Sequence, residues 1–481
     1  MSEHTYDVVV VGHGVAGLSA AVSARESGAS VAVLERAVEA EAGGNTRYTE
    51  AYLRMASLDE PSEDLVDRLL GDFMGHPDPG IMREQAYAPA KQSPLLKAHH
   101  TIDLDYIEAF ADQAGDTLGW LTGHGLTFDH LPTLFLTTST TRMAPVGGGL
   151  AIVETMGQRA KELGVEFHYE TTARDLITDD TGRVTGVRAE TPQGRAIFTG
   201  AVILASGGFQ GNAEMQARYF GKLGLTCRPV ARGGNYNKGE GIEMGLAVGA
   251  ATAGNFAMFH AEPVDPRSGE AEAAIMCFPN GILVNARAER FTDEARGPVD
   301  AWYERVTREI HDQPEGIAWV IMDAQGMAVP NVRTGIRTDQ PSISAMTISG
   351  LADQLGLAAE ALEATVSAYN NACTDGEFDH SQPDGLATQG LTPAKSNWAR
   401  PLTEGPFEAW PIMAANVFTF GGLKTTASAE VVSRDGRPIP GLYAAGEMTG
   451  LYYSNYTGST SVLRGAVFGR IAGREAAGGG A

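Results

Sequence analysis

The stretch Val8-Val9-Val10-Val11-Gly12-His13-Gly14-Val15-Ala16-Gly17 decides the fold. Its four valines form a short apolar run, typical of a strand that is buried on both faces. The glycines follow the spacing G-x-G-x-x-G, and residues 16–27 then have helical periodicity, with Gly28 placed to end the helix. A second apolar run at residues 30–34 predicts a parallel strand joined to the first through this helix.

Each glycine of this turn has a distinct task in holding a dinucleotide. Gly12 permits the tight turn, Gly14 lets the backbone approach a pyrophosphate, and Gly17 lets helix and strand pack closely. Glu35, at the end of the second strand, is placed to accept hydrogen bonds from a ribose. The helix start adds free N–H donors and the positive end of its dipole. The segment therefore predicts a dinucleotide site rather than an ordinary glycine-rich turn.

Three further glycine turns favour FAD over NAD as the dinucleotide. Gly43-Gly44-Asn45-Thr46 follows the second strand, where a flavin dinucleotide extends past its diphosphate. Ala205-Ser206-Gly207-Gly208 and Ala445-Gly446-Glu447 end two later apolar strands, and each could bring backbone against an extended cofactor. Singly, each is more often a structural turn; in this order they favour FAD. The predicted cofactor-binding residues are Gly12, Gly14, Val15, Ala16, Gly17, Glu35, Arg36, Gly43, Gly44, Asn45, Thr46, Ala173, Ala205, Ser206, Gly207, Gly446, Glu447, Ser461 and Val462.

Composition narrows the partners. Among 481 residues, 36 Lys and Arg stand against 59 Asp and Glu, a net charge of −23 that disfavours nucleic acid and anionic membrane surfaces. No apolar stretch approaches the ~18 residues that a membrane span needs, and the six residues before the first apolar run leave no room for a signal peptide. The three cysteines show no metal-binding spacing. We therefore expect a cytoplasmic protein with no membrane span, no zinc site and no nucleic-acid partner.

The remaining pattern predicts an α/β protein of two domains. Residues 150–163 and 357–372 have helical patterns, as do residues 462–477 at the end of the chain. Strands are predicted at 174–177, 184–189, 196–198, 201–205, 282–285, 317–322 and 441–445. We infer a Rossmann-like FAD-binding domain built from residues 1–257 and 419–481, with an inserted α+β substrate-capping domain at 258–418.

Four segments carry a resemblance to a known family. They are Gly43-Gly44-Asn45-Thr46-Arg47-Tyr48-Thr49, Arg290-Phe291-Thr292-Asp293-Glu294, Phe418-Thr419-Phe420-Gly421-Gly422 and Ser454-Asn455-Tyr456-Thr457-Gly458. The chain resembles, over nearly its whole length, the flavoproteins related to succinate dehydrogenase and fumarate reductase. The first three segments are most similar to tricarballylate dehydrogenase-like members, and the fourth to 3-ketosteroid Δ1-dehydrogenases. The resemblance implies that FAD N5 exchanges a hydride with a carbon β to a carbonyl or carboxylate.

The chain also departs from that family. Fumarate reductases carry an arginine that acts as the proton donor, four residues after the glutamate that matches Glu294. This chain has Pro298 at that position, and its Arg296 lies two residues earlier. A substrate-binding histidine is replaced by Phe418, and a substrate-binding arginine by Tyr456. The histidine that links flavin covalently in succinate dehydrogenase has no counterpart at Gly44-Asn45-Thr46. We therefore expect non-covalent FAD and do not expect fumarate reduction.

The candidate catalytic residues are Tyr456, His260, Arg296 and Arg142. Tyr456 aligns with the tyrosine that, in the steroid dehydrogenases, hydrogen-bonds the substrate ketone; its alternative is an aromatic that packs on the flavin. His260 aligns with a substrate-contacting histidine, although an isolated histidine is more often structural. Arg142 could bind a carboxylate through both nitrogens, or be an ordinary surface residue. Glu294 is expected to anchor its own hairpin.

These observations predict an FAD-dependent dehydrogenase acting on CH–CH groups. The substrate would be a small cyclic keto acid, ketone or polycarboxylate, with α-proton abstraction and β-hydride transfer. An ene-reductase running the reverse reaction, and a flavoprotein subunit of an electron-transfer complex, are the alternatives. The electron acceptor would be oxygen, a quinone or a redox protein, and any iron–sulfur or haem centre would lie on another chain. The sequence does not identify the general base.

Overall fold

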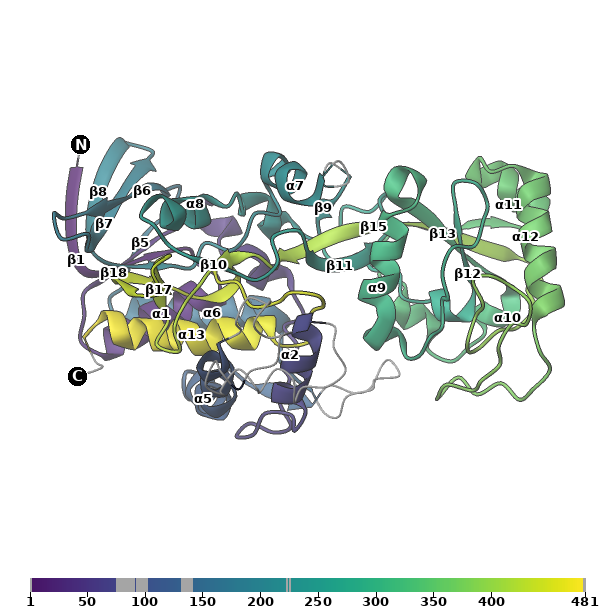
Figure 1. Ribbon diagram of the computed structural model, residues 1–481, viewed down its shortest axis with the longest axis horizontal. Helices are drawn as coiled ribbons and strands as arrows, with labels where there is room; N and C mark the ends of the chain where they lie inside the picture. The colour runs from purple at the N-terminus through teal and green to yellow at the C-terminus, as the bar shows by residue number, and fades with distance from the viewer. Residues whose placement is uncertain are drawn as a thin grey trace.

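Two β-sheets, one toward each end of an elongated molecule, organise the chain (Figure 1). The computed structural model describes residues 2–74, 91, 103–130, 142–221, 224 and 226–478. The first sheet belongs to both ends of the chain and the second to its middle, so the chain leaves the first body and returns to it. Strands β11 (Phe259–Val264) and β15 (Phe407–Thr419) run between the two bodies (Figure 1).

The first sheet has eight strands, in the order β17-β18-β8-β1-β2-β5, and β7 and β6 continue from β8. Its centre is parallel: β1 pairs with β2 and β8, and the valines at 8–10 are fully buried, as their apolar run predicts. The strands are β1 (Ser2–Val11), β2 (Val31–Leu34), β5 (Glu166–His168), β6 (Thr172–Thr178), β7 (Val184–Thr191), β8 (Gly194–Leu204), β17 (Glu430–Val432) and β18 (Pro438–Ala444).

Helices α1 (Val15–Glu26) and α13 (Ser461–Ala476) pack along each other on one face of this sheet (Figure 1). Their backbones come very close, since a Cβ on Gly469 would lie 2.3 Å from the carbonyl oxygen of Ala16. Glycine at this contact therefore lets the C-terminal helix sit directly against the first helix. Helices α5 (Leu104–Gly123) and α6 (Gly148–Glu162) pack against this pair, and the other helices that precede the second sheet are α2 (Leu65–Met74), α7 (Ala213–Phe220) and α8 (Glu240–Ala247).

The second sheet is largely antiparallel, in the order β11-β15-β13-β12, with β14 and β9 also paired to β15. Its remaining strands are β9 (Arg228–Pro229), β12 (Ile282–Asn285), β13 (Ile317–Met322) and β14 (Ile343–Ala345). Its helices are α9 (Val299–His311), α10 (Ala324–Met327), α11 (Ile348–Leu355) and α12 (Ala359–Ala372). Two small sheets complete the fold, β3 (Phe128–His130) with β4 (Met143–Pro145) and β10 (Thr252–Ala253) with β16 (Gly422–Leu423).

The α/β class and the order of most elements are confirmed, with one correction. Residues 196–198 and 201–204, predicted as parts of separate strands (196–198 and 201–205), belong to the single strand β8, which ends at Leu204. The reason is pairing, because β1 bonds to β8 from Ser2↔Ala196 to Val11↔Leu204 and holds it extended throughout, with one register shift. Strand β9 belongs to the second sheet although it precedes residue 258. The boundaries of the inserted domain therefore stay a prediction.

Within the described ranges, no helix is both long and apolar enough to cross a membrane. In the same part of the chain, no group of three or more His, Cys, Asp and Glu side chains is arranged to hold a metal ion.

Candidate functional site

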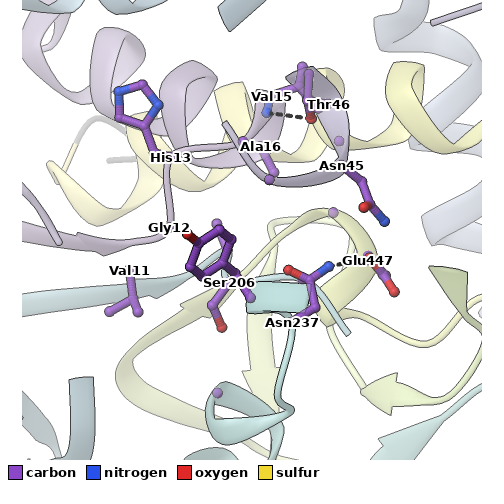
Figure 2. Close-up of a pocket in the computed structure, with 18 of the residues that line it drawn as sticks. Val11, Gly12, His13, Val15, Ala16, Asn45, Thr46, Ser206, Asn237 and Glu447 are labelled. Atoms are coloured by element: carbon purple, nitrogen blue, oxygen red, sulfur yellow. Dashed lines mark hydrogen bonds between the residues drawn. The ribbon is translucent and has the colours of Figure 1, made fainter. Parts of the chain in front are cut away.

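A cavity opens where the carboxyl ends of the parallel strands meet the starts of α1 and α13 (Figure 2). Ligands of open parallel sheets bind at this edge because the glycine turns and helix N-termini gather there. All the predicted cofactor-binding residues except Gly17 line this cavity. We call it the cofactor cavity. Segments far apart in the sequence, such as Gly43-Gly44-Asn45 and Gly446-Glu447, thus meet around one hollow.

The turn before α1 leaves no room for side chains. Gly12 has φ of +113°, and a Cβ there would lie 2.4 Å from the carbonyl oxygen of Ala205. Gly17 does not line the cavity, and a Cβ there would lie 2.0 Å from the Gly12 carbonyl oxygen. Thr46 Oγ1 accepts a hydrogen bond of 3.1 Å from the N–H of Val15 (Figure 2). The cradle therefore admits only a ligand that approaches the backbone closely, as a pyrophosphate does.

Glu35 closes the other side of the turn. Its Oε2 accepts from the N–H of His13 at 3.0 Å, and its Oε1 from the N–H of Ala37 at 2.7 Å. The side chain is buried, and this burial raises the pKa of its carboxyl group, while the two N–H groups oppose that rise. Each carboxylate oxygen keeps a second lone pair. Glu35 can therefore accept ribose hydroxyls while it holds the turn.

Glu447 joins the two bodies at the cavity. Its Oε1 accepts from the N–H of Thr419 at 2.9 Å, and its Oε2 from Gln210 at 3.2 Å and Asn237 at 3.4 Å (Figure 2). Arg36, at the other side, forms a 2.9 Å ion pair with Glu240. Both predicted residues thus line the cavity while anchoring its walls.

Sequence reasoning missed several lining residues, among them His13, Thr171, Asn237, Met244 and Arg464. Arg464 follows Ser461 by one helical turn on α13, so helical spacing could have found it. His13 stands between Gly12 and Gly14 of the glycine motif, whereas Thr171 and Asn237 lie in loops and Met244 lies on α8, where no motif marks them. Burial lowers the pKa of His13 to about 4, which keeps this imidazole neutral.

A second cavity, of about 150 Å³, adjoins the first. The two cavities share Thr49, Val417, Phe418, Ser461 and Val462. Of the four predicted catalytic residues, Tyr456, His260 and Arg142 line the second cavity. A ligand there would lie beside whatever fills the cofactor cavity. We call this second hollow the substrate cavity.

The Tyr456 hydroxyl lies at the N-terminus of α13. It accepts hydrogen bonds from the N–H groups of Thr460, at 3.1 Å, and Ser461, at 3.2 Å. Its ring packs against His260 and Phe418, at centroid distances of 4.4 Å and 4.9 Å. Accepting two N–H bonds polarises an O–H group and makes it a stronger donor.

His260 lies on β11 and contacts helix α9. Its Nε2 is 2.7 Å from the hydroxyl of Tyr303, while its Nδ1 has no hydrogen-bond partner among the described residues. Burial, with help from Arg308, lowers the pKa of His260 to about 3. The imidazole is therefore neutral and cannot act as a cationic acid near neutral pH.

Arg142 and Arg296 have different places. Arg142 lines the substrate cavity, with its Nη2 3.8 Å from Oδ2 of Asp300. Arg296 lines neither cavity; its Nη2 bonds to Glu309 at 2.9 Å and its guanidinium lies over the ring of Trp302. The structure thus does not bring Arg296 to the other three candidates. Glu294 holds its hairpin, accepting from the Leu283 N–H at 3.0 Å, as expected.

Carboxylates outnumber arginines in the substrate cavity. Glu50, Glu262, Glu272 and Asp300 line it, against Arg142 and Arg337. Arg337 forms a 2.9 Å ion pair with Glu50. Burial raises the pKa of both Glu262 and Glu272, and nearby carboxylates add to that rise. Sequence reasoning found none of these acids, because their segments give no motif.

A sequence model of the FAD binding domain family matches residues 7–463 of the chain. The chain belongs to this family. The glycine cradle, the buried carboxylate of Glu35 and the extended cavity all fit FAD.

Curated relatives cover the whole chain at low identity. The NADH:acrylate oxidoreductase of Vibrio harveyi is 28% identical over 535 residues, which cover 98% of this chain and 50% of that protein. The chain thus spans about half the length of this relative. The 4-oxocyclohexanecarboxylate 2-dehydrogenase of Sinomonas cyclohexanicum is 28% identical over 549 residues, covering 98% of this chain and 93% of that protein.

Solved structures agree on the fold. An open conformation of a flavocytochrome c3 fumarate reductase has a TM-score of 0.76 and 24% identity, covering 99% of this chain and 78% of its own. The 3-ketosteroid-Δ4-(5α)-dehydrogenase of Rhodococcus jostii RHA1 has a TM-score of 0.70 and 26% identity, covering 99% and 98%. The predicted resemblance to fumarate reductases and ketosteroid dehydrogenases is confirmed.

Proposed function

We propose that this flavoenzyme desaturates the bond α,β to a ketone carbonyl. The observation that carries the proposal is the place of Tyr456: it lines the substrate cavity, and its hydroxyl accepts a hydrogen bond from the N–H of Ser461, a residue that lines both cavities. A neutral donor at this place suits a carbonyl oxygen. FAD, when bound, supplies the acceptor for the hydride that leaves the β-carbon.

The residues around the ketone have different roles in the proposed reaction. Tyr456 donates to the carbonyl oxygen, and this bond strengthens as the α-proton leaves and negative charge grows. Thr460 and Ser461 hold the hydroxyl through their N–H groups, so the donor needs no reorganisation during the reaction. Neutral His260 packs against the Tyr456 ring and fixes its orientation.

The charges of the substrate cavity favour a ketone with at most one carboxylate. Each of its arginines already faces an acid, Arg142 beside Asp300 and Arg337 beside Glu50. A polycarboxylate would need further cations to balance its charges, and unbalanced charges are costly away from bulk water. Among the substrate classes expected from the sequence, cyclic ketones and keto acids are therefore the better fit.

Some relatives support desaturation, and others support the reverse reaction, reduction of the double bond. The names of the Sinomonas dehydrogenase and the Rhodococcus ketosteroid dehydrogenase describe dehydrogenation of ring ketones. The Vibrio acrylate oxidoreductase favours the second candidate, an ene-reductase that uses the same residues. That relative is about twice as long as this chain, so a separate electron-transfer partner is a third candidate.

The test is anaerobic bleaching of the flavin. Purified protein would be mixed with cyclohexanone, 4-oxocyclohexanecarboxylate and tricarballylate in turn, and absorbance near 450 nm recorded. We expect the ring ketones to reduce the flavin and tricarballylate to leave it oxidised. Acid treatment of the same sample should release FAD, since no histidine is predicted at the linkage position. Reduction by tricarballylate alone would reject the ketone assignment.

A further inference from the structure

Helix α9 begins with an acid in the substrate cavity. Pro298 is its N-cap and Asp300 lies in its first turn. The Asp300 side chain is 10% exposed and lines the cavity beside Tyr303 and Arg142. Asp300 thus lies two residues beyond Pro298, the position at which fumarate reductases carry their proton-donating arginine.

The carboxylate of Asp300 lacks the hydrogen-bond donors that hold the buried acids Asp265 and Glu294. Neither oxygen accepts a hydrogen bond of good geometry from the described residues; its own N–H and that of Ala301 are the nearby backbone donors. By contrast, Asp265 accepts from both the N–H and guanidinium of Arg267, and Glu294 accepts from Leu283 and Arg290. A buried carboxylate without such donors costs stability, so its retention indicates a task.

Two other groups that line the cavity, Tyr303 and His260, are poorer proton acceptors than a carboxylate. The Tyr303 hydroxyl is already bonded to His260, and burial raises its pKa well above the usual value. The pKa of His260, lowered to about 3, makes that imidazole a weak base. Asp300, Tyr303 and Arg142 line the substrate cavity and do not line the cofactor cavity.

We propose that the Asp300 carboxylate is the general base that removes the α-proton of the ketone. The α-carbon C–H bond breaks, its proton forms an O–H bond on Asp300, and its electron pair moves toward the carbonyl oxygen held by Tyr456. The hydride from the β-carbon goes to bound FAD, so the substrate loses one proton and one hydride and becomes an enone. Arg142 positions the carboxylate through their ion pair. This assignment rests on the proposed desaturation.

The titration of Asp300 agrees with this role. Burial raises its pKa to about 6, while Arg142 and, more weakly, Arg54 act against that rise. Tyr303, Tyr456 and His260 face the same cavity. A base works only when ionised, so the rate of flavin reduction should rise as pH increases through about 6.

The experiment separates proton removal from hydride transfer. Dithionite would reduce the flavin in wild type and in three variants, Asp300→Asn, Asp300→Glu and Asp312→Asn. The last is the control, because Asp312 is an exposed acid at the other end of α9. The reduced flavin cannot accept hydride, so deuterium uptake at the α-carbon of cyclohexanone in D₂O reports proton removal alone. Flavin reduction by cyclohexanone in the oxidised enzymes, cyclohexanone binding by calorimetry and FAD content complete the set.

We expect Asp300→Asn to lose ~10²–10⁴-fold in both exchange and flavin reduction, the usual contribution of a general base. FAD content and cyclohexanone binding should stay within about twofold, Asp300→Glu should regain part of the exchange, and Asp312→Asn should match wild type. Exchange by Asp300→Asn at the wild-type rate would overturn the assignment, as would a loss explained by lost binding or lost FAD. If wild type neither exchanges nor oxidises any ketone, the proposed function fails and this role falls with it.

Discussion

The two adjoining cavities differ in how their walls are made. The cofactor cavity is formed largely by backbone at glycine turns, and its predicted residues come from short continuous segments such as Gly43-Gly44-Asn45-Thr46. The substrate cavity is formed by side chains from dispersed segments, including Glu50, Glu262 and Asp300. Binding in the cofactor cavity should therefore be sensitive to added atoms. Binding and reaction in the substrate cavity should be sensitive to changed charges or hydroxyl groups. The following predictions test that difference, beginning with the largest effect.

Gly17→Ala should abolish FAD binding. The added Cβ would lie 2.0 Å from the carbonyl oxygen of Gly12, a backbone atom that cannot move without opening the turn. The ratio of flavin to protein absorbance after purification measures the loss. Gly119→Ala is the matched control, because Gly119 is an exposed helical glycine whose Cβ would meet nothing within 4 Å. The free energy of unfolding of that control should rise by about 0.5–1 kcal/mol, because alanine favours the helix more than glycine does. Full FAD occupancy in Gly17→Ala would contradict the close packing.

Tyr456→Phe should slow flavin reduction by cyclohexanone ~10²–10³-fold, about 3–4 kcal/mol, while changing ketone binding little. Phenylalanine keeps the ring contacts with His260 and Phe418, so FAD content should be unchanged. Anaerobic stopped-flow measurement across a range of ketone concentrations separates the rate from the binding. A variant that reduces flavin at the wild-type rate but needs much more ketone would show that Tyr456 only binds.

The same contrast explains what the sequence could predict. Gly12 and Gly446 were found because a strand followed by a glycine turn is a local signal, and parallel strands bring such turns to one edge. Asp300 and Glu262 carry no local signal, since a lone acid in a helix or strand is usually a solvated residue. Arg296 was selected by its position along the chain, yet its pairing with Glu309 keeps it out of the cavity. Side-chain pairing of this kind is tertiary and has no sequence period.

Glu35→Ala should weaken FAD binding by one to two orders of magnitude, or ~1–3 kcal/mol. The substitution leaves ribose hydroxyls without an acceptor, and it also frees the N–H groups of His13 and Ala37. FAD retained after dialysis, with thermal unfolding of the stripped protein beside it, distinguishes the two losses. Unchanged FAD affinity with lowered thermal stability would mean that Glu35 serves the turn and not the ribose.

Glu262→Gln should change substrate preference without changing FAD content. Glu262 lines the substrate cavity, and burial raises its pKa, an effect strengthened by Glu50 and opposed by Arg337. Because this pKa is about 7, part of the Glu262 charge is present near neutral pH and repels an anionic ketone. Removing that charge should tighten binding of 4-oxocyclohexanecarboxylate several-fold, or ~1 kcal/mol, relative to cyclohexanone.

The pH dependence of this preference gives the sharper test. As pH falls, Glu262 takes up a proton, so wild type should approach the variant, and its discrimination against the carboxylate-bearing ketone should shrink. The variant has no such proton to gain, so its preference should depend less on pH, with Glu272 accounting for any remainder. Calorimetric binding of both ketones to wild type and variant over a range of pH measures this directly. Parallel pH profiles would mean that Glu262 does not sense the substrate's charge, and that the cavity discriminates by shape.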